Sequence, residues 1–385
     1  MVNTDIFVVG GGPAGLAAAI AARHRGFNVT VADRVVPPAD KACGEGLMPD
    51  ALLALAKLGI PMSAADSFPF RGIRFLDRGA EIAASFPSGT GRGVRRTTLH
   101  RMMADHAESI GVKLLWGTHI DLNSLRCGWI VGADGENSVV RRWAGLDKRF
   151  RDERRFGFRC HYRVEPWTDY MELYWGEAHQ VYVTPVSSES VCVVAISRDS
   201  RLRLDDALLG FPLLAERLKP GAIIAGERGA VTSSRRLQSV YRDRIALIGD
   251  ASGSVDAITG EGLCLAFRQA IALAEAIEGD DLRQYQRQHR RIARRPEWMA
   301  RLLLMLGDHP AARRIAMHAM AAHPSIFTEL LTVHVGAHDE KKLLLDSLPI
   351  DGSSVRAGDR AGSRSNANES RIHTERHSSY RPWRV

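Results

Sequence analysis

The stretch that decides the fold is Gly10-Gly11-Gly12-Pro13-Ala14-Gly15, near the start of the 385-residue chain. It matches the pattern G-x-G-x-x-G, follows a short apolar run at residues 5–9 and opens an alanine-rich segment. The apolar run predicts a buried strand, and the alanine-rich segment predicts a helix. A glycine turn between a strand and a helix is typical of folds that bind a dinucleotide.

Each glycine of the pattern has a separate predicted role. Gly10 permits the tight turn, Gly12 lets the backbone approach a pyrophosphate, and Gly15 lets the helix pack closely on the strand. The start of the helix then offers free amide donors and the positive end of its dipole to phosphate groups. Asp33 follows a second predicted strand at residues 27–32, where it can accept a hydrogen bond from a ribose hydroxyl. A turn without a ligand would leave Asp33 unexplained.

Two later motifs favour FAD over NAD as the dinucleotide. Gly132-Ala133-Asp134-Gly135 follows an apolar strand, and Gly249-Asp250-Ala251 follows the apolar run at residues 245–248 and precedes Thr259-Gly260-Glu261-Gly262. A carboxylate at the end of a strand can orient ribityl hydroxyls, and the amides of the following helix can face the pyrophosphate or the carbonyl edge of the flavin. Each motif alone is a common turn, but the three in this order predict an FAD site.

With these motifs the sequence resembles the FAD-dependent monooxygenases that share the para-hydroxybenzoate hydroxylase fold. Within that family it looks closest to the geranylgeranyl-reductase-like branch. The resemblance covers roughly residues 4–335. The matching segments are Gly10–Gly15 with Asp33, Lys41–Leu47, Arg95–Leu99, Gly132–Gly135 and Gly249–Gly262.

The resemblance implies one non-covalently bound FAD and assigns residues to it. Asp33 would bind the adenosine ribose, Arg96 the phosphate or sugar region, and Asp250 the ribityl–pyrophosphate side. The loop Thr259–Gly262 would pass the isoalloxazine ring. The complete set of predicted cofactor-binding residues is Gly10, Gly12, Gly15, Asp33, Arg96, Asp134, Asp250, Gly260 and Gly262. No catalytic side chain and no metal site are predicted.

The predicted fold class is α/β, with a Rossmann-like FAD-binding domain, an inserted antiparallel-sheet substrate domain and C-terminal helices. Alternating and β-branched segments between residues 154 and 197 indicate the antiparallel sheet. Helices are predicted at residues 262–278, 282–295 and 298–335. The predicted division is residues 1–150 and 236–280 for the FAD-binding domain, 151–235 for the substrate domain, 281–349 for the helical region and 350–385 for a disordered tail.

The loop Lys41-Ala42-Cys43-Gly44-Glu45-Gly46-Leu47 is the segment that points to the geranylgeranyl-reductase-like branch. In relatives it lies on the substrate side of the flavin, so that Cys43 or Glu45 could border the reaction site. The alternative is that the Cys43 thiol packs within a glycine-rich loop. A reactive thiol requires an accessible, electropositive setting, and the sequence leaves both interpretations open.

Composition and charge restrict the partners and the location. The formal net charge is +8, and seven arginines lie between Arg283 and Arg301. Because no nucleic-acid reader motif accompanies them, we expect no nucleic-acid partner. The arginines indicate a solvated helix face, or one that attracts an anionic cofactor, substrate or membrane surface, although nothing further supports a membrane contact. Five scattered cysteines without a C-x-x-C pair, and no apolar run near the roughly 20 residues of a membrane helix, predict a cytoplasmic protein.

Two departures from the family pattern concern the FAD-binding domain. Many relatives carry a proline where this chain has Ala257, so the loop beside the flavin is expected to be less rigid. Only twelve residues, 117–128, stand where relatives place a β-meander, which is too few for three ordinary strands. The back of the domain is therefore expected to be abbreviated, which leaves the activity of the protein open.

The leading hypothesis is an NAD(P)H-using monooxygenase that hydroxylates an aromatic or polyketide-like small molecule. The flavin would carry the reaction, while the protein orients it and excludes water. The alternative is reduction of prenyl double bonds, which the Cys43 loop and Gly260-Glu261-Gly262 favour. A third hypothesis, of another class, is a non-catalytic flavin-binding or maturation partner.

The expected substrate is an apolar or aromatic small molecule, for which Tyr174, Trp175 and Tyr182 could line a pocket. The chain shows no second complete dinucleotide fingerprint. NAD(P)H is therefore expected to bind only transiently, as the reductant of the flavin. The sequence does not indicate an oligomeric state.

Overall fold

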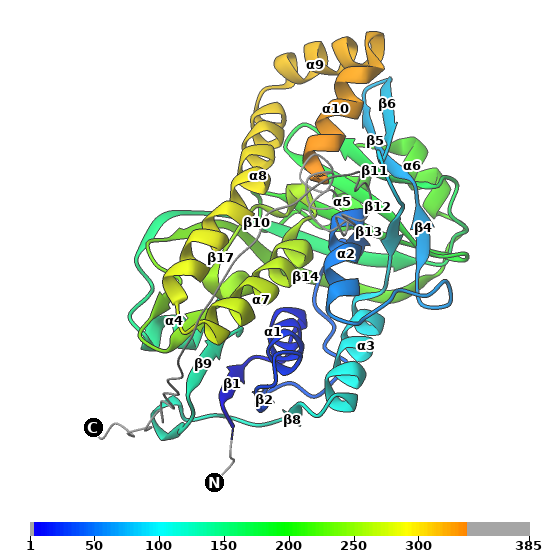
Figure 1. Cartoon of the computed structure of the whole chain (residues 1–385). Helices are drawn as coiled ribbons and strands as arrows, with labels where there is room; N and C mark the ends of the chain where they lie inside the picture. The colour runs from blue at the N-terminus through cyan, green and yellow to red at the C-terminus, as the bar shows by residue number, and fades with distance from the viewer. Residues whose placement is uncertain (1–3, 337–385) are drawn as a thin grey trace, which may run out of the picture. The chain divides into compact units, whose positions relative to one another are not determined.

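The computed structural model describes residues 4–336, without the side chains of residues 149–153. Its first sheet has six strands in the order β15-β16-β9-β1-β2-β8, and every pair is parallel except β15–β16. The strands are β1 (Ile6–Val9), β2 (Val29–Ala32), β8 (Lys113–Leu115), β9 (Trp129–Gly132), β15 (Tyr241–Arg242) and β16 (Ile245–Leu247). The predicted β-α-β unit and the return of the chain near residue 245 are confirmed (Figure 1).

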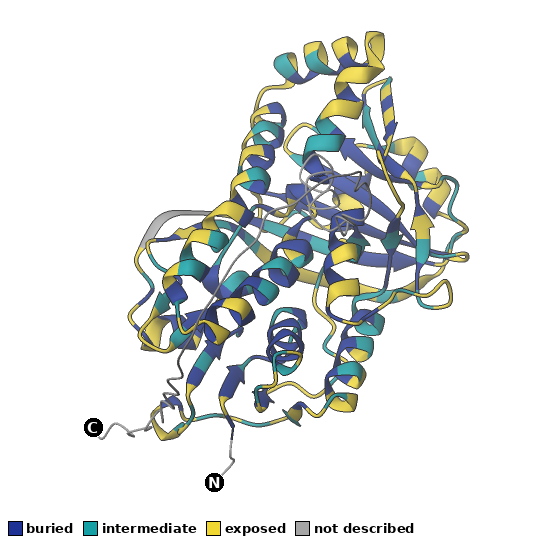
Figure 2. Cartoon of the chain, viewed as in Figure 1, coloured by how far each residue is buried: buried dark blue, intermediate teal, exposed yellow. Residues whose placement is uncertain are grey.

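Helix α1 (Pro13–Arg23) lies against this sheet and is covered by two further helices, α3 (Arg96–Ser109) and α7 (Gly262–Glu278). Five alanines of α1 are buried, and such short side chains let helix axes approach closely. Figure 2 shows α1 as almost entirely buried. Helix α2 (Pro49–Lys57) also packs on α7. Helices α1 and α7 therefore share one hydrophobic core.

The second sheet has eight strands in the order β17-β14-β10-β13-β12-β11-β5-β6. All its pairs are antiparallel except β5–β11. The strands are β5 (Gly72–Asp77), β6 (Ala80–Ser85), β10 (Arg149–Tyr162), β11 (Tyr170–Trp175), β12 (His179–Ser187), β13 (Ser190–Ser197), β14 (Ile223–Leu237) and β17 (Gly253–Ser254). Strands β12 and β13 are buried along nearly their whole length, because α5 (Leu204–Leu208) and α6 (Pro212–Leu218) pack on one face and α8 (Leu282–Asp308) on the other.

The predicted antiparallel sheet is therefore present, but its strands are not confined to residues 151–235. Strands β5 and β6 come from within the expected first part of the FAD-binding domain, and β17 comes from within the second part. The parallel pair between β5 and β11 joins segments about a hundred residues apart, from Gly72 against Tyr170 to Leu76 against Tyr174. No local sequence pattern indicates a pairing between segments so far apart. The predicted domain boundary at residue 150 therefore leaves β5 and β6 out of the antiparallel sheet.

A small three-stranded sheet in the order β3-β7-β4 lies against β12 of the eight-stranded sheet. Its strands are β3 (Gly46–Leu47), β7 (Gly91–Gly93) and β4 (Phe68–Phe70). A Cβ atom on Gly93 would overlap the carbonyl oxygen of Pro185 in β12. This close backbone contact fixes the small sheet, and with it the loop that contains Cys43, against the eight-stranded sheet.

The C-terminal helices differ from those expected. Residues 282–308 form one helix, α8, with Pro296 inside it, whereas the sequence pattern predicts a break between residues 295 and 298. The chain breaks instead before Pro310 and Pro324, the first residues of α9 (Pro310–Ala322) and α10 (Pro324–His334). A proline suits the first turn of a helix, where its missing N–H has no intrahelical partner. Residues 337–349 of the expected helical region and the expected disordered tail, 350–385, lie outside the described residues.

The short segment 117–128 contains a single 3-10 turn at Leu122–Ser124 and no strand. The expectation that it is too short for a three-stranded meander is confirmed. A helix α4 (Val139–Trp143) follows β9 in this half of the molecule. Within residues 4–336, no helix combines the length and the apolar character needed to cross a membrane.

A buried ion pair ties the C-terminal helices to the eight-stranded sheet. Nε of Arg313 in α9 lies 2.8 Å from Oδ2 of Asp77 at the end of β5, and the two side chains are 3% and 1% exposed. The Arg313 guanidinium also stacks over the ring of Trp175. Removing one partner of such a pair leaves an uncompensated buried charge.

We expect Asp77→Ala to lower the free energy of unfolding by about 3–5 kcal/mol, because Arg313 would remain buried and unpaired. The double substitution Asp77→Leu with Arg313→Met replaces both charges by apolar groups, and it should cost much less. Urea unfolding followed by circular dichroism measures both. If the single and double variants lose the same free energy of unfolding, the unpaired charge of Arg313 is not the cause of the loss.

Candidate functional site

Backbone contacts shape the glycine turn between β1 and α1. Gly10 has a φ of 110°, a conformation that favours glycine. A Cβ atom on Gly10 would lie 2.8 Å from the amide nitrogen of Asp134, and one on Gly15 would overlap the carbonyl oxygen of Gly10. The turn and the close packing of the helix thus require glycine at both positions.

The start of α1 offers donors that the protein itself does not use. Gly12 is the N-cap residue, and no side chain caps the amides that follow it. Arg96 lies beside the turn, with Nη2 4.0 Å from the position of a Cβ on Gly12, and its buried Nε has no hydrogen-bond partner among the described residues. Uncapped helix amides beside an unpartnered guanidinium nitrogen are suited to bind a phosphate.

Asp33 is held next to the same turn. Its Oδ2 accepts a hydrogen bond from the amide of Gly11 at 2.6 Å, and its Oδ1 accepts one from the amide of Val35 at 2.8 Å. An ionised carboxylate accepts about four hydrogen bonds, so acceptor sites remain for a ribose hydroxyl. The ring of Trp116 lies against Gly11, and the side chain of His100 bonds to the Gly11 carbonyl oxygen at 2.8 Å. No motif in the sequence indicates that these two rings belong to the site.

The Asp134 carboxylate is hydrogen-bonded within the protein. Its carboxylate accepts hydrogen bonds from the Ser138 hydroxyl and from the amides of Val139 at 2.6 Å and Val140 at 3.2 Å. These are the first amides of α4, so the side chain caps that helix. The backbone of Asp134 does lie against Gly10. The contact between the Asp134 carboxylate and a cofactor stays a prediction.

The segment around Asp250 approaches the same turn from the other side. Gly249 has a φ of 59°, and a Cβ on it would lie 2.7 Å from Cβ of Ala14 in α1. Asp250 follows in a 3-10 turn and forms an ion pair with Nζ of Lys41 at 3.2 Å. The structure thus brings together the strand-end motifs that lie about 240 residues apart in the chain, at the start of α1.

The loop before α7 is firmly held although it carries Ala257 in place of a proline. The Asp256 carboxylate accepts from the amide of Ile258 at 2.9 Å and pairs with Nη1 of Arg155 at 2.9 Å. The Tyr182 hydroxyl donates to the carbonyl oxygen of Ile258 at 2.8 Å. Gly260 then adopts a left-handed conformation, and Gly262 begins α7 without a side-chain cap. These bonds restrain the loop without a proline.

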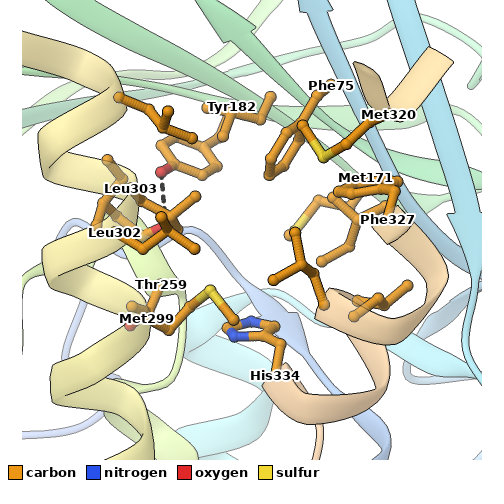
Figure 3. Close-up of a pocket in the computed structure, with 16 residues that line it drawn as sticks. Phe75, Met171, Tyr182, Thr259, Met299, Leu302, Leu303, Met320, Phe327 and His334 are labelled. Atoms are coloured by element: carbon orange, nitrogen blue, oxygen red, sulfur yellow. Dashed lines mark hydrogen bonds between the residues drawn. The ribbon is translucent and has the colours of Figure 1, made fainter. Parts of the chain in front are cut away.

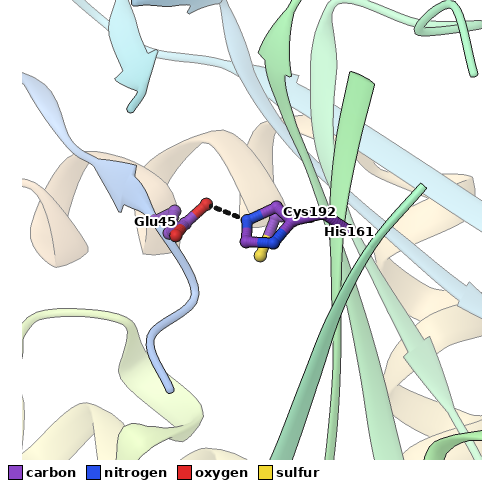
Figure 4. A group of neighbouring side chains, drawn as sticks. All are labelled: Glu45, His161 and Cys192. Atoms are coloured by element: carbon purple, nitrogen blue, oxygen red, sulfur yellow. Dashed lines mark hydrogen bonds and ion pairs between the residues drawn. The ribbon is translucent and has the colours of Figure 1, made fainter. Parts of the chain in front are cut away.

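Glu45 lies at the centre of a buried hydrogen-bond network that links the Cys43 loop to both sheets (Figure 4). Its Oε1 accepts from the amide of Arg96 at 2.9 Å, and its Oε2 lies 2.6 Å from Nε2 of His161. Nδ1 of His161 lies 2.7 Å from Nη1 of Arg159, whose other amino group pairs with Asp40. Because a guanidinium only donates, Nδ1 accepts and the Nε2–H of His161 donates to Glu45.

The same tautomer argues against a metal ion among Glu45, His161 and Cys192, whose potential ligand atoms lie within 4.8 Å of one another. Both ring nitrogens of His161 are engaged in hydrogen bonds, and a guanidinium adjoins the ring. Burial raises the pKa of the Cys192 thiol, and Glu45 raises it further. Figure 4 shows the Glu45 carboxylate directed at the imidazole ring, with the thiol beside the ring. We interpret this cluster as a structural network.

The Cys43 thiol lies in the same loop as Glu45 and contacts the backbone of that loop. Its half-buried Sγ lies 3.4 Å from the amide of Glu45, and its carbonyl oxygen lies 3.6 Å from the Cys192 thiol. The sequence motifs indicate this loop but do not indicate the buried partners of Glu45. The available signal was Arg159 and His161, two residues apart and therefore on one face of a predicted strand.

An apolar pocket lies between the eight-stranded sheet, the loop before α7 and helices α8 to α10 (Figure 3). Its lining is Ile73, Phe75, Met171, Leu173, Tyr182, Ile258, Thr259, Met299, Leu302, Leu303, Leu306, Met320, Phe327, Leu330, Leu331 and His334. Of the three aromatic residues expected to line a pocket, only Tyr182 is among these. Tyr174 packs against α6, and Trp175 is fully buried in the core below α8.

Comparison with known proteins supports the predicted resemblance. A model of the FAD-binding domain matches residues 3–125, which include the glycine turn, Asp33 and Arg96. The chain is similar to members of the FAD-dependent monooxygenase superfamily, including reductases of the geranylgeranyl-reductase type. It is an FAD-dependent oxidoreductase, as the sequence analysis expected. The uncapped start of α1 and the unpartnered Nε of Arg96 fit the diphosphate of FAD.

Relatives of this flavoprotein include proteins named as reductases. The menaquinone reductase of Mycobacterium tuberculosis is 28% identical over 321 residues, which cover 73% of this chain and 78% of the relative. The geranylgeranyl diphosphate reductase of Synechocystis is 26% identical and covers 71% of this chain and 74% of its own length. A solved flavoprotein/dehydrogenase from Cytophaga hutchinsonii has the same fold, with a TM-score of 0.74 at 20% identity over 88% of this chain and 94% of that chain.

We predict that Arg96→Gln weakens FAD binding by about ten- to a hundredfold, because a charge-assisted hydrogen bond to phosphate is lost. Titration of the apoprotein with FAD, followed by flavin fluorescence, measures the dissociation constant. Arg101→Gln, an exposed position on the same helix, is the matched control and should leave it unchanged. Equal affinities in the two variants would contradict the placement of Arg96 at the diphosphate.

We predict that Glu45→Gln destabilises the protein by about 1–3 kcal/mol although it preserves the shape of the side chain. Its amide nitrogen would face either the Nε2–H of His161 or the backbone N–H of Arg96, and two donors cannot bond to each other. Urea unfolding compares this variant with Glu108→Gln, an exposed control on α3. A Glu45→Gln protein as stable as the control would show that His161 is free to change its tautomer.

Proposed function

We propose that this flavoprotein reduces carbon–carbon double bonds of an isoprenoid substrate, with FAD as the redox cofactor and NAD(P)H as the source of electrons. The observation that carries the proposal is the apolar pocket beside the loop Ile258–Thr259. This loop opens the segment that the family resemblance assigns to the isoalloxazine ring. A substrate in the pocket would therefore lie next to the expected position of the reactive flavin.

The chemistry of the pocket lining favours a hydrocarbon chain. Leucine, isoleucine, methionine and phenylalanine form most of it, and the Tyr182 hydroxyl already donates to the Ile258 carbonyl oxygen. Burying apolar surface contributes about 25 cal/mol per Å², whereas burying an unpaired polar group costs free energy. An isoprenoid chain has no hydrogen-bonding groups, so it can be buried among these residues without leaving a polar group unpaired.

The names of the relatives support reduction as well. Menaquinone reductases are similar to this chain over nearly three quarters of its length, and a geranylgeranyl diphosphate reductase matches over a similar span. The pocket and these relatives together reverse the order of the hypotheses from the sequence, which placed hydroxylation first. The relatives are named as oxidoreductases, which disfavours the third hypothesis, a non-catalytic flavin-binding partner.

Bound FAD would supply hydride transfer, and the residues of this chain would hold the reactants and exclude water. The uncapped amides at the start of α1 and the Arg96 guanidinium would hold the diphosphate. The side chains of α8 and α10 would cover the substrate and keep solvent away from the reaction. Because no second complete dinucleotide fingerprint is present, NAD(P)H would bind only transiently. A cytoplasmic location and the absence of a nucleic-acid partner remain predictions from the sequence.

Hydroxylation of an apolar or aromatic molecule is the second candidate. Relatives named as monooxygenases also match this chain, including one that covers 71% of it. The same apolar pocket would accept such a molecule. The two reactions differ in their need for molecular oxygen, which makes them separable by experiment.

We expect the purified holoprotein to reduce a geranylgeranyl chain under strict exclusion of oxygen, with NADPH or dithionite as the reductant. Mass spectrometry of geranylgeraniol or of a geranylgeranylated quinone would show the gain of two hydrogen atoms for each reduced bond. A product that appears only in air and carries an added oxygen atom would instead establish the monooxygenase. The Arg96→Gln variant, measured without added FAD, serves as the control for flavin dependence.

A further inference from the structure

We infer that the pocket contains one polar subsite, in which His334 donates a hydrogen bond to an oxygen atom of the substrate. The pocket would then select an isoprenoid chain that carries a carbonyl or a similar acceptor, rather than a pure hydrocarbon. The inference rests on the proposed function in one respect, which is that the apolar pocket holds the substrate.

His334 is the polar group in the described pocket lining that the protein leaves uncommitted. The Tyr182 hydroxyl donates to the Ile258 carbonyl oxygen, and the Thr259 hydroxyl donates to the Asp256 carbonyl oxygen. His334 is only 6% exposed; its Nδ1 faces Glu261 at 3.6 Å without a hydrogen bond, and no hydrogen bond from a described residue reaches its Nε2. A buried polar group without a partner is costly, which favours a role in binding for such a group.

An acidic side chain lies behind the imidazole ring and orients it. Oε2 of Glu261, itself 1% exposed, lies 3.6 Å from Nδ1 of His334. Glu261 is held in turn by Nη2 of Arg295 at 3.0 Å, and Arg295 also pairs with Asp50 at 2.8 Å. Burial raises the pKa of Glu261, and Arg295 and His334 oppose that rise. Nδ1 would accept the proton that His334 and the Glu261 carboxyl group share, which leaves the Nε2–H of His334 to donate to a molecule in the pocket.

The position of His334 gives the pocket a direction. Figure 3 shows the imidazole ring next to Met299 at one end of the pocket, with Phe75 and Met320 at the other end. Glu261 follows Gly260 directly in the loop that the resemblance assigns to the isoalloxazine ring. The oxygen-bearing end of the substrate would thus lie on the side of the flavin loop, and the chain would extend toward Phe75.

A purely structural role for His334 is the competing explanation, because its contact with Glu261 also joins α10 to the start of α7. Selectivity between two ligands of the same shape separates the two explanations. A structural role would change the affinity for both ligands alike, whereas a hydrogen bond to the ligand changes the affinity only for the one that bears the acceptor.

The test uses farnesylacetone, a branched isoprenoid ketone, and the hydrocarbon of the same skeleton in which a methylene group replaces the ketone oxygen. Binding to the oxidised holoprotein, without NAD(P)H, is measured by quenching of tryptophan fluorescence and by shifts in the flavin absorbance. We expect the unmodified protein to prefer the ketone by about tenfold, the effect of one buried hydrogen bond. His334→Phe should abolish the preference, and His334→Gln should retain part of it, because an amide also donates.

Bound FAD and thermal unfolding report whether each variant is folded, and His318→Phe on the exposed face of α9 is the matched control. Equal affinity of the unmodified protein for the two probes, binding of neither probe, or an unchanged preference in His334→Phe would each overturn the inference. A His334-dependent preference for the ketone in a protein that fails to reduce any prenyl double bond would refute the proposed function and leave the subsite standing.

Discussion

The cofactor-binding half of this protein depends on one contact, the approach of the Gly15 backbone to the Gly10 carbonyl oxygen. A side chain at position 15 would push α1 away from β1 and would turn the first amides of the helix away from the edge of the sheet. Gly249 imposes a second condition from a distant part of the chain, because it packs on Ala14. The phosphate-binding geometry therefore exists only when the second part of the domain has returned to the sheet.

Two buried glutamates connect this half to the substrate side. Glu45 links the amide of Arg96, beside the glycine turn, to His161 in the eight-stranded sheet. Glu261 links the start of α7 to Arg295 in α8 and lies behind His334 in α10. Buried charges are weak evidence for stability, because desolvation offsets much of their attraction. Their hydrogen bonds are directional, however, and they position one loop of the predicted flavin site relative to each wall of the pocket.

The pocket itself is a product of long-range assembly. Strand β5, the loop before α7 and helices α8 to α10 each contribute to it, and none of these segments encloses a cavity alone. The parallel pairing of β5 with β11 and the buried pair of Arg313 with Asp77 bring the walls together. The leucines and methionines of α8, which alone indicate only a helix core, become the lining of a site because α9 and α10 fold back beside them.

The sequence by itself determined the cofactor class, the α/β fold and the three strand-end motifs, because these depend on short patterns whose chemistry is local. A glycine pattern between a strand and a helix has few structural solutions, and Asp33 follows at a fixed spacing. Only the tertiary structure showed that the Asp134 carboxylate caps α4, that Pro296 lies within one continuous helix, and that β5 and β6 join the second sheet. It alone placed His334 beside Glu261, since pairings between segments far apart in the chain are set by packing and leave no periodic trace in the sequence.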